Sequence, residues 1–136
     1  MLILNPSSVK FGTTPWENVG SIAVNRSAAE TLVEWTAGGP HVAFADVPRQ
    51  RVEIAVKHGL TRGDMDGPRP GERATLVWFT APGASDAGRR KASADCVVLD
   101  VEHEIALGRS AMRSVTLLAL SSDGSADPIV LSDAES

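Results

Sequence analysis

The sequence is poor in residue types on which several common folds and sites depend. It contains one cysteine, Cys96, no tyrosine, and only 4% aromatic residues. A single thiol excludes an internal disulfide and a cysteine-built zinc site, so stability has to come from packing or from assembly. The shortage of rings also argues against a single-strand nucleic-acid binder, because such proteins stack bases on exposed aromatic side chains.

Long hydrophobic runs and a basic surface are also missing. No segment approaches the roughly 18 apolar residues of a membrane helix, and Met1–Leu4 is too short and too weakly charged for a signal peptide. The formal net charge of −4 argues against a protein that wraps around nucleic acid, since phosphate neutralisation needs a basic face. We therefore expect a soluble chain without a targeting segment, folded as one domain over residues 1–136.

The residue patterns of common catalytic and metal sites are absent from the sequence. His41, His58 and His103 share no metal-ligand spacing, and Cys96 has no histidine close to it along the chain. His103 falls on the apolar side of an expected strand, where a core histidine is commoner than a catalytic one. No glycine-rich phosphate loop opens a helix. We therefore expect a protein that is not an enzyme and that uses no cofactor and no metal.

Alternation of apolar and polar residues is the main structural signal, and it predicts strands. The expected strands are 19–26, 42–47, 50–58, 74–80, 96–107, 112–120 and 129–131. Residues 112–120 are apolar on both faces, as is typical of a central strand. In 96–107 the period of two places Cys96 and Val98 on the same face as the acidic residues that follow them. The pattern predicts a mainly β fold, a small antiparallel β-barrel or sandwich with at most one short helix.

Residues 27–36 fit two structures. Ser27-Ala28-Ala29-Glu30 has the form of a capping box, and the glycines and proline that follow would stop a helix. Thr31, Val33 and Trp35 are β-formers in strict alternation, which favours a strand paired with the one before or after it. Both alternatives stay open, with the strand favoured.

Two long polar connections flank the expected strand at 74–80. They cover 59–71 and 82–94, and both are rich in glycine and proline. Loops of this length in a small domain usually have a function. We therefore expect a loop-hairpin unit at about 59–94 that projects from the body of the domain.

Several segments, read in their order along the chain, carry a resemblance to one family. They are Val19–Arg26, Val33-Glu34-Trp35, Gly39-Pro40-His41-Val42-Ala43-Phe44-Ala45-Asp46-Val47-Pro48, Gln50-Arg51-Val52-Glu53-Ile54, Pro70-Gly71-Glu72-Arg73-Ala74, Ser121-Ser122-Asp123-Gly124 and Asp127-Pro128-Ile129. In these segments the sequence resembles phage tail tube proteins, the major subunits of the pipe through which a tailed phage delivers its DNA. The resemblance spans most of the chain.

The resemblance implies a structural role. Six copies would form a ring, rings would stack into a hollow tube, and each subunit would contribute four strands to a continuous inner barrel. DNA would pass through the lumen without specific binding. The implied partners are other copies of the chain together with sheath, tape-measure and baseplate or terminator proteins. The implied location is the tail of the virion, after assembly in the bacterial cytoplasm, with no membrane insertion by this chain.

The lumen candidates are acidic, because a surface that lets DNA pass has to repel phosphates rather than hold them. Asp100, Glu102 and Glu104 occupy every second position of one expected strand, so their carboxylates share a face. Glu53 joins them if its strand pairs with theirs. Ordinary solubilising charges on an exposed sheet face are the alternative explanation.

Contacts between subunits or rings need a second set of residues. A dense basic run lies in the expected projecting unit, whereas the segment after residue 113 is acidic, and complementary ends would set the stacking order. The interface candidates are Arg89, Arg90, Lys91, Asp133, Glu135 and Trp16. A solvated loop tip is the alternative for the basic run, and core packing is the alternative for Trp16.

Two other functions stay open at this point. One is a related part of the same machine: a tail terminator, a tube initiator or a type VI secretion-like tube subunit. Polymerisation separates these, since a tube subunit elongates and a cap does not. The other is a stand-alone β-sandwich binding module, for example for carbohydrate, which the low aromatic content disfavours.

Overall fold

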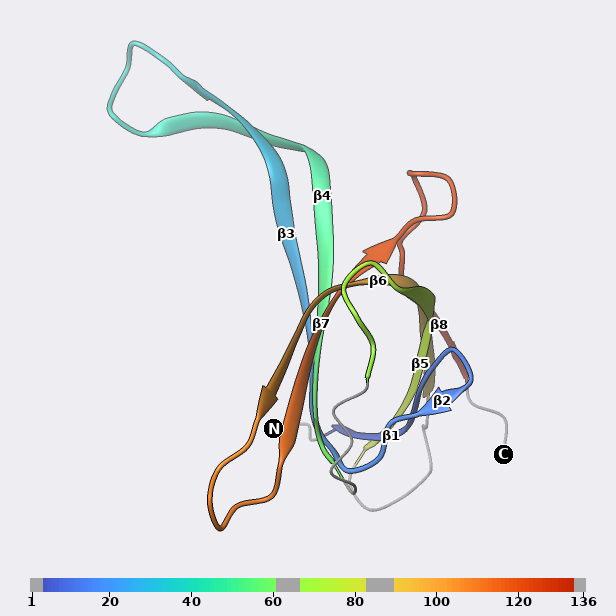
Figure 1. The fold of residues 1–136 in the computed structure, drawn as a ribbon. Helices are drawn as coiled ribbons and strands as arrows, with labels where there is room; N and C mark the ends of the chain where they lie inside the picture. The colour runs from blue at the N-terminus through green and yellow to red at the C-terminus, as the bar shows by residue number, and fades with distance from the viewer. Residues whose placement is uncertain (1–3, 61–66, 83–89, 134–136) are drawn as a thin grey trace.

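The structure, a computed structural model, describes residues 4–60, 67–82 and 90–133. Its regular elements are strands of one eight-stranded antiparallel sheet (Figure 1). In chain order they are β1 (Leu4–Phe11), β2 (Thr14–Pro15), β3 (Val19–Trp35), β4 (Val42–Gly59), β5 (Arg73–Pro82), β6 (Arg90–Glu104), β7 (Met112–Leu120) and β8 (Val130–Asp133). No helix occurs in the described part of the chain, so none there is suited to cross a membrane. The mainly β prediction is confirmed.

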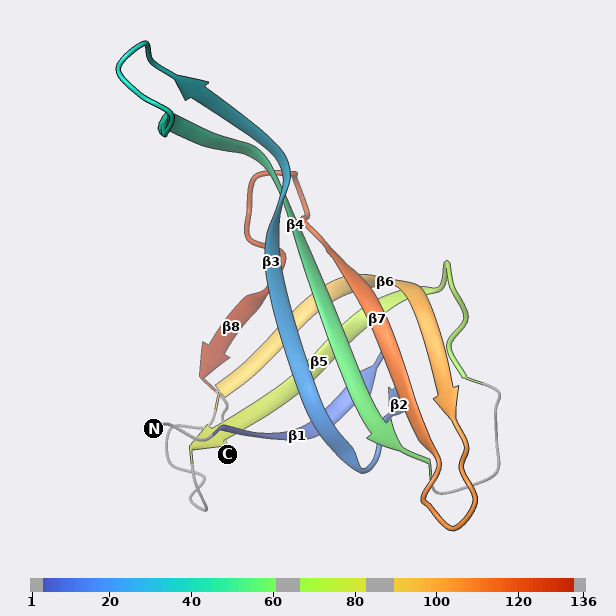
Figure 2. The same cartoon turned by 90° about the vertical axis from the view of Figure 1, so that its left-hand side faces the viewer.

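The strand order explains the shape of the sheet. It runs β2-β1-β5-β6-β7-β4-β3, and β8 pairs with the first residues of β6. β6 is long and bent, so its first half pairs with β5 and its second half with β7 (Figure 2). The sheet therefore curls over itself, but it is not closed into a barrel. The prediction of β7 as a central strand is confirmed, since β7 lies between β6 and β4.

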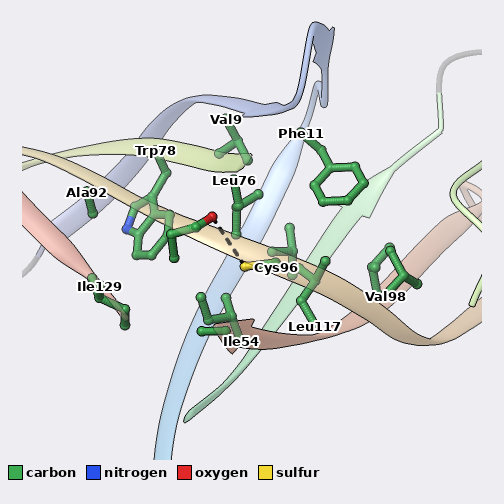
Figure 3. Packing of buried hydrophobic residues seen from close by; sticks show 14 of the residues in the cluster. Val9, Phe11, Ile54, Leu76, Trp78, Ala92, Cys96, Val98, Leu117 and Ile129 are labelled. Carbon is green, nitrogen blue, oxygen red and sulfur yellow. Dashed lines mark hydrogen bonds between the residues drawn. The ribbon is translucent and has the colours of Figure 1, made fainter. Parts of the chain in front are cut away.

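The core fills the inside of this curl. Ile54, Leu76 and Leu117 are fully buried, although they come from three different strands. Cys96 lies among them and donates a hydrogen bond from Sγ to the carbonyl oxygen of Ala94 (Figure 3). Burial of side chains of this size contributes roughly 1.5–3 kcal/mol each to folding. The core thus joins the strands around both halves of β6.

A bulge in β6 decides which side chains face the core. The pairing of β6 with β7 shifts register between Val98 and Asp100. Cys96 and Val98 are buried before the shift, and Val101 and His103 point to the same side after it. The sequence-based assignment of Cys96 and Val98 to the acidic face was therefore wrong, because one extra residue reverses the alternation of faces.

Strands β3 and β4 continue beyond the sheet as a two-stranded arm, defined here as residues 27–51 (Figure 1). β7 pairs with β4 only over Glu53–Gly59, so the arm has no third strand among the described residues. Residues 27–35 are strand, the favoured alternative for 27–36. The element that projects is thus the arm. The expected unit at 59–94 does not project as a whole, because β5 lies inside the sheet between β1 and β6.

Candidate assembly surfaces

The outer face of the four strands β6-β7-β4-β3 has no aromatic ring in its paired rows, and it mixes polar side chains with the partly exposed apolar residues Val97, Met112 and Leu118. Directly opposite residues of neighbouring strands share a face of the sheet. One row contains Asp100, Thr116, Ala55 and Ala23, and the next contains Glu102, Ser114, Lys57 and Ser21. Asp100, Glu102 and Glu104 are all exposed, so the prediction that their side chains share one exposed face agrees with the structure.

Glu53 lies on this outer face as well, but it is not beside the other three acids. β7 separates its strand from β6, and Glu53 is opposite Leu118. Its Oε1 forms an ion pair with Nη2 of Arg51 at 2.6 Å. With Lys57 also on this face, four carboxylates stand against two cations. The surface is therefore acidic on balance, with the negative charge concentrated on β6.

The four-stranded unit has an unpaired strand edge on each side. β3 is the last strand of the sheet and pairs only with β4. On the opposite side, the pairing of β6 with β5 ends at Val97, so the outer edge of 100–104 pairs with no strand in the described chain. Three antiparallel steps lead from β6 to β3, so these two edges run in opposite directions. Edges of this kind are templates for pairing with another chain.

The arm exposes large apolar side chains that no other element covers. Trp35 is 59% exposed and lies opposite Val42 in the pairing of β3 with β4. The exposed apolar residues of the arm are Leu32, Val33, Trp35, Val42, Phe44 and Val47. An isolated two-stranded hairpin is only marginally stable in water. The arm is therefore suited to bury these side chains against a partner.

The loop between β7 and β8 supports the base of the arm. Asp127 accepts a hydrogen bond from Nη1 of Arg26 at 3.0 Å and another from the backbone N–H of Ile129 at 3.0 Å. Asp123 accepts from the backbone N–H groups of Ser125 and Ala126, each at 2.8 Å. These donors hold the pKa of both carboxyl groups below the ordinary value. The loop is thus a self-bonded unit tied to β3.

The opposite end of the sheet carries a second uncovered apolar surface. The β6–β7 turn, defined here as residues 105–111, lies far from the arm in both views (Figures 1 and 2). Leu107 is 103% exposed and Ile105 is 66% exposed. Gly108 has a positive φ of 74°, which fits its place in a tight reversal of the chain.

A buried polar cluster lies at the end of β4 nearest this turn. Arg113 donates from Nε to Nε2 of His58 at 2.9 Å, and the Trp16 ring stacks on His58 with centroids 5.4 Å apart. Burial, followed by the Arg113 charge, lowers the pKa of His58 below its ordinary value. Both side chains are almost inaccessible to solvent, so the pair is suited to hold strands together rather than to bind a ligand. Trp16 is buried here, which fits the core alternative.

Three further interface candidates, Arg90, Lys91 and Asp133, lie where the start of β6 pairs with β8. Arg90 is opposite Asp133 of β8 in the same chain, and Lys91 is opposite Ser132. The basic run and the acidic C-terminal segment therefore meet within one subunit where the structure describes them, instead of lying at opposite ends. Arg89 and Glu135 lie outside the described residues.

Metal-ligand clusters and reactive thiols were sought beside these surfaces. The described residues contain no group of histidine, cysteine and carboxylate side chains arranged to hold a metal ion. Burial raises the pKa of the Cys96 thiol to about 12, which keeps it protonated and unreactive. A scan against protein-family models found no matching family, and a search of curated proteins found no similar sequence. We therefore infer the function from the open strand edges, the acidic outer face and the exposed apolar side chains.

Proposed function

We propose that this chain is the major subunit of a bacteriophage tail tube, in which hexameric rings stack into a hollow pipe that conducts the genome into the host. One observation carries the proposal. The four-stranded unit β6-β7-β4-β3 combines an outer face of net acidic charge with open edges that run in opposite directions on its two sides. The sequence resemblance to tail tube proteins supports the same assignment.

The open edges supply a way to form the ring. If β3 of one copy pairs with residues 100–104 of the next, the new pairing is antiparallel and every copy keeps the same orientation. Such a head-to-tail contact closes into a ring when the rotation between copies permits it. Six copies then give 24 strands, which at about 4.8 Å spacing and about 40° tilt form a backbone circle of roughly 45 Å.

The outer face of this sheet suits a lumen for DNA. Asp100, Glu102 and Glu104 would repeat in every subunit and form bands of negative charge that repel phosphates. Lys57 and Arg51 moderate that field, and Arg51 is already paired with Glu53. The rest of the face is made of small or aliphatic side chains, among them Ser114, Thr116 and Leu118, so DNA meets neither stacking rings nor a continuous basic track. The expected result is passage without specific binding.

The proposal includes a place in the virion. The subunit would assemble in the bacterial cytoplasm and remain in the phage tail. Sheath, tape-measure and baseplate or terminator proteins would be its further partners. The uncovered arm and turn provide the surface that such an assembly requires beyond the ring contacts.

The test targets the open edge of β3. Val24 is 41% exposed on that strand and lies on the side of Ile54, so Val24→Lys places an inward-pointing charge at the open edge, a change that blocks strand addition. Urea unfolding of the variant monomer checks that the fold is kept. The matched control is Val130→Lys, at a 60% exposed position on β8. Sedimentation is expected to give rings for the parent and the control and monomers for Val24→Lys. Rings of unchanged size and stability in Val24→Lys would contradict the edge pairing.

A further inference from the structure

The two uncovered apolar surfaces lie at opposite ends of the subunit. The arm continues the sheet past the β7–β8 loop, and the β6–β7 turn ends it on the other side (Figure 2). Leu32 and Phe44 share one face of the arm, since Glu34 is opposite Phe44 and two residues from Leu32, and both are more than half exposed. Ile105 and Leu107 are even more exposed on the turn. No other segment of the described chain covers either surface.

The composition of the turn is unusual for an exposed reversal. Such turns are dominated by glycine, proline, asparagine, aspartate and serine, each for a conformational reason. Here the segment begins Ile105-Ala106-Leu107. Gly108 has a positive φ of 74°, a backbone conformation that favours glycine. The two large aliphatic side chains do not serve the turn itself, which points to a contact with another molecule.

Charge complementarity indicates what that molecule is. Between residues 31 and 48 the arm carries Glu34 and Asp46 and contains no lysine or arginine. In residues 105–111, Arg109 is the charged residue and no acid is present. The outer part of the arm, beyond Arg49 and Arg51 at its base, is thus acidic and apolar, whereas the turn is basic and apolar. A second copy of this chain offers each surface the complement that it needs.

The positions of the surfaces define the type of contact. A joint between one end of a subunit and the opposite end of another is heterologous, so each copy donates one arm and receives another. The arm and the turn lie at the two ends of the strands, whereas the edges that close the ring lie at their sides. The end-to-end contact therefore repeats at an angle to the ring. It thus connects successive rings and does not close into a dimer.

We propose that the arm of each subunit docks on the β6–β7 turn of a subunit in the adjacent ring. Leu32 and Phe44 cover Ile105 and Leu107, and Glu34, on the same face of the arm, lies near Arg109. This inference rests on the proposed tube function and names the contact that stacks the rings.

Disulfide trapping tests the contact directly. Phe44→Cys and Leu107→Cys are prepared separately and mixed under mild oxidation. The native Cys96 does not interfere, because it is buried and unreactive. A cross-linked dimer is expected in the mixture, with at least tenfold less in either variant alone. Assemblies that form without this cross-link, or that cross-link equally in Phe44→Cys alone, would overturn the docking.

A charge exchange provides a second readout. Arg109→Glu and Glu34→Arg are each expected to lower the sedimenting tube fraction at least fivefold while rings persist, and the double variant is expected to restore it to within twofold. Lys10→Glu, an exposed change on β1, is the control and keeps parental tubes. Parental tube length in every variant would overturn the docking and leave the tube function standing. A parent protein that forms neither rings nor tubes would overturn the tube function itself.

Discussion

Arg113 of β7 donates a hydrogen bond from Nε to Nε2 of His58 on β4, 2.9 Å away and almost inaccessible to solvent. The two residues are also cross-strand neighbours in the sheet. An imidazole nitrogen accepts this bond only when it carries no proton. The contact between β4 and β7 therefore depends on a neutral His58, in the same four strands that carry the proposed lumen face.

Stability is predicted to fall as the pH is lowered from about 7 to about 5. The pKa of His58 is lowered in the folded protein, so the unfolded chain binds more protons in this window, and stability rises with pH. One such group gives a slope of at most about 1.4 kcal/mol per pH unit. Urea unfolding at several pH values measures the slope.

His58→Gln is the matched variant for this measurement. Its amide oxygen can accept the bond from Arg113 and does not titrate, so the slope is expected to flatten. Asp123 and Asp127 do not obscure the result, because their lowered pKa values place their titration below the window. A slope that is the same in the parent and in His58→Gln would contradict the assignment to His58.

Two leucines are predicted to differ sharply in their effect on folding. Leu117 is fully buried, so Leu117→Ala removes core contacts and leaves a cavity, at a cost of about 2–5 kcal/mol. Leu107→Ala is the control, because this side chain is 103% exposed, and it is expected to change stability by less than about 0.5 kcal/mol. Chemical unfolding of the monomer measures both. Comparable losses would mean that Leu107 packs within its own subunit.

Reversal of the lumen charge is predicted to make the tube hold DNA. Asp100→Lys, Glu102→Lys and Glu104→Lys together leave the fold intact, because the three side chains are exposed. Tubes of this variant are expected to retain DNA at low salt and to release it as salt rises, since the binding rests on phosphate neutralisation. Co-sedimentation of tubes with duplex DNA measures the effect.

The control for the charge reversal is the neutral triple variant Asp100→Asn, Glu102→Gln and Glu104→Gln. It removes the repulsion without adding a cation, so it is expected to retain little DNA at any salt concentration. Equal retention by the lysine and amide variants would show that this face does not line the channel.

The sequence predicted well where burial alone determines the pattern. The alternation on both faces of β7 identified a central strand, and the acidic residues of β6 are exposed as their spacing requires. For Trp16 the sequence allowed either an interface or a core position, and its packing against His58 places it in the core. Side-chain periodicity carries this information because it follows directly from the pleat of a strand.

Errors arose where tertiary pairing overrides the local pattern. Val97, Val98 and Leu99 are all apolar, so their sequence does not reveal the bulge that reverses the faces of β6. β1 contains Pro6 and a register shift between Ser7 and Lys10, and it shows no alternation that would identify it. The region around β5 was expected to project because long polar connections flank it, and without β1 nothing in the sequence showed that β5 has a partner on each side.

The arm was missed because the alternation was assigned to two separate strands with Pro48 between them. The expected strands 42–47 and 50–58 are parts of one strand, β4. Proline is tolerated there because β4 has a partner on only one side along the arm, so a missing N–H disrupts no second ladder. The useful signal was the stretch of apolar and acidic residues from 31 to 48 without any lysine or arginine.

The central claim is that this chain assembles into a hollow tube. Negative-stain electron microscopy of the purified full chain at high concentration tests it most directly. The account predicts six-fold rings with a central channel, stacked into tubes with the arms bridging successive rings. A field of single subunits without rings, together with a monodisperse monomer in sedimentation at the same concentration, would contradict it.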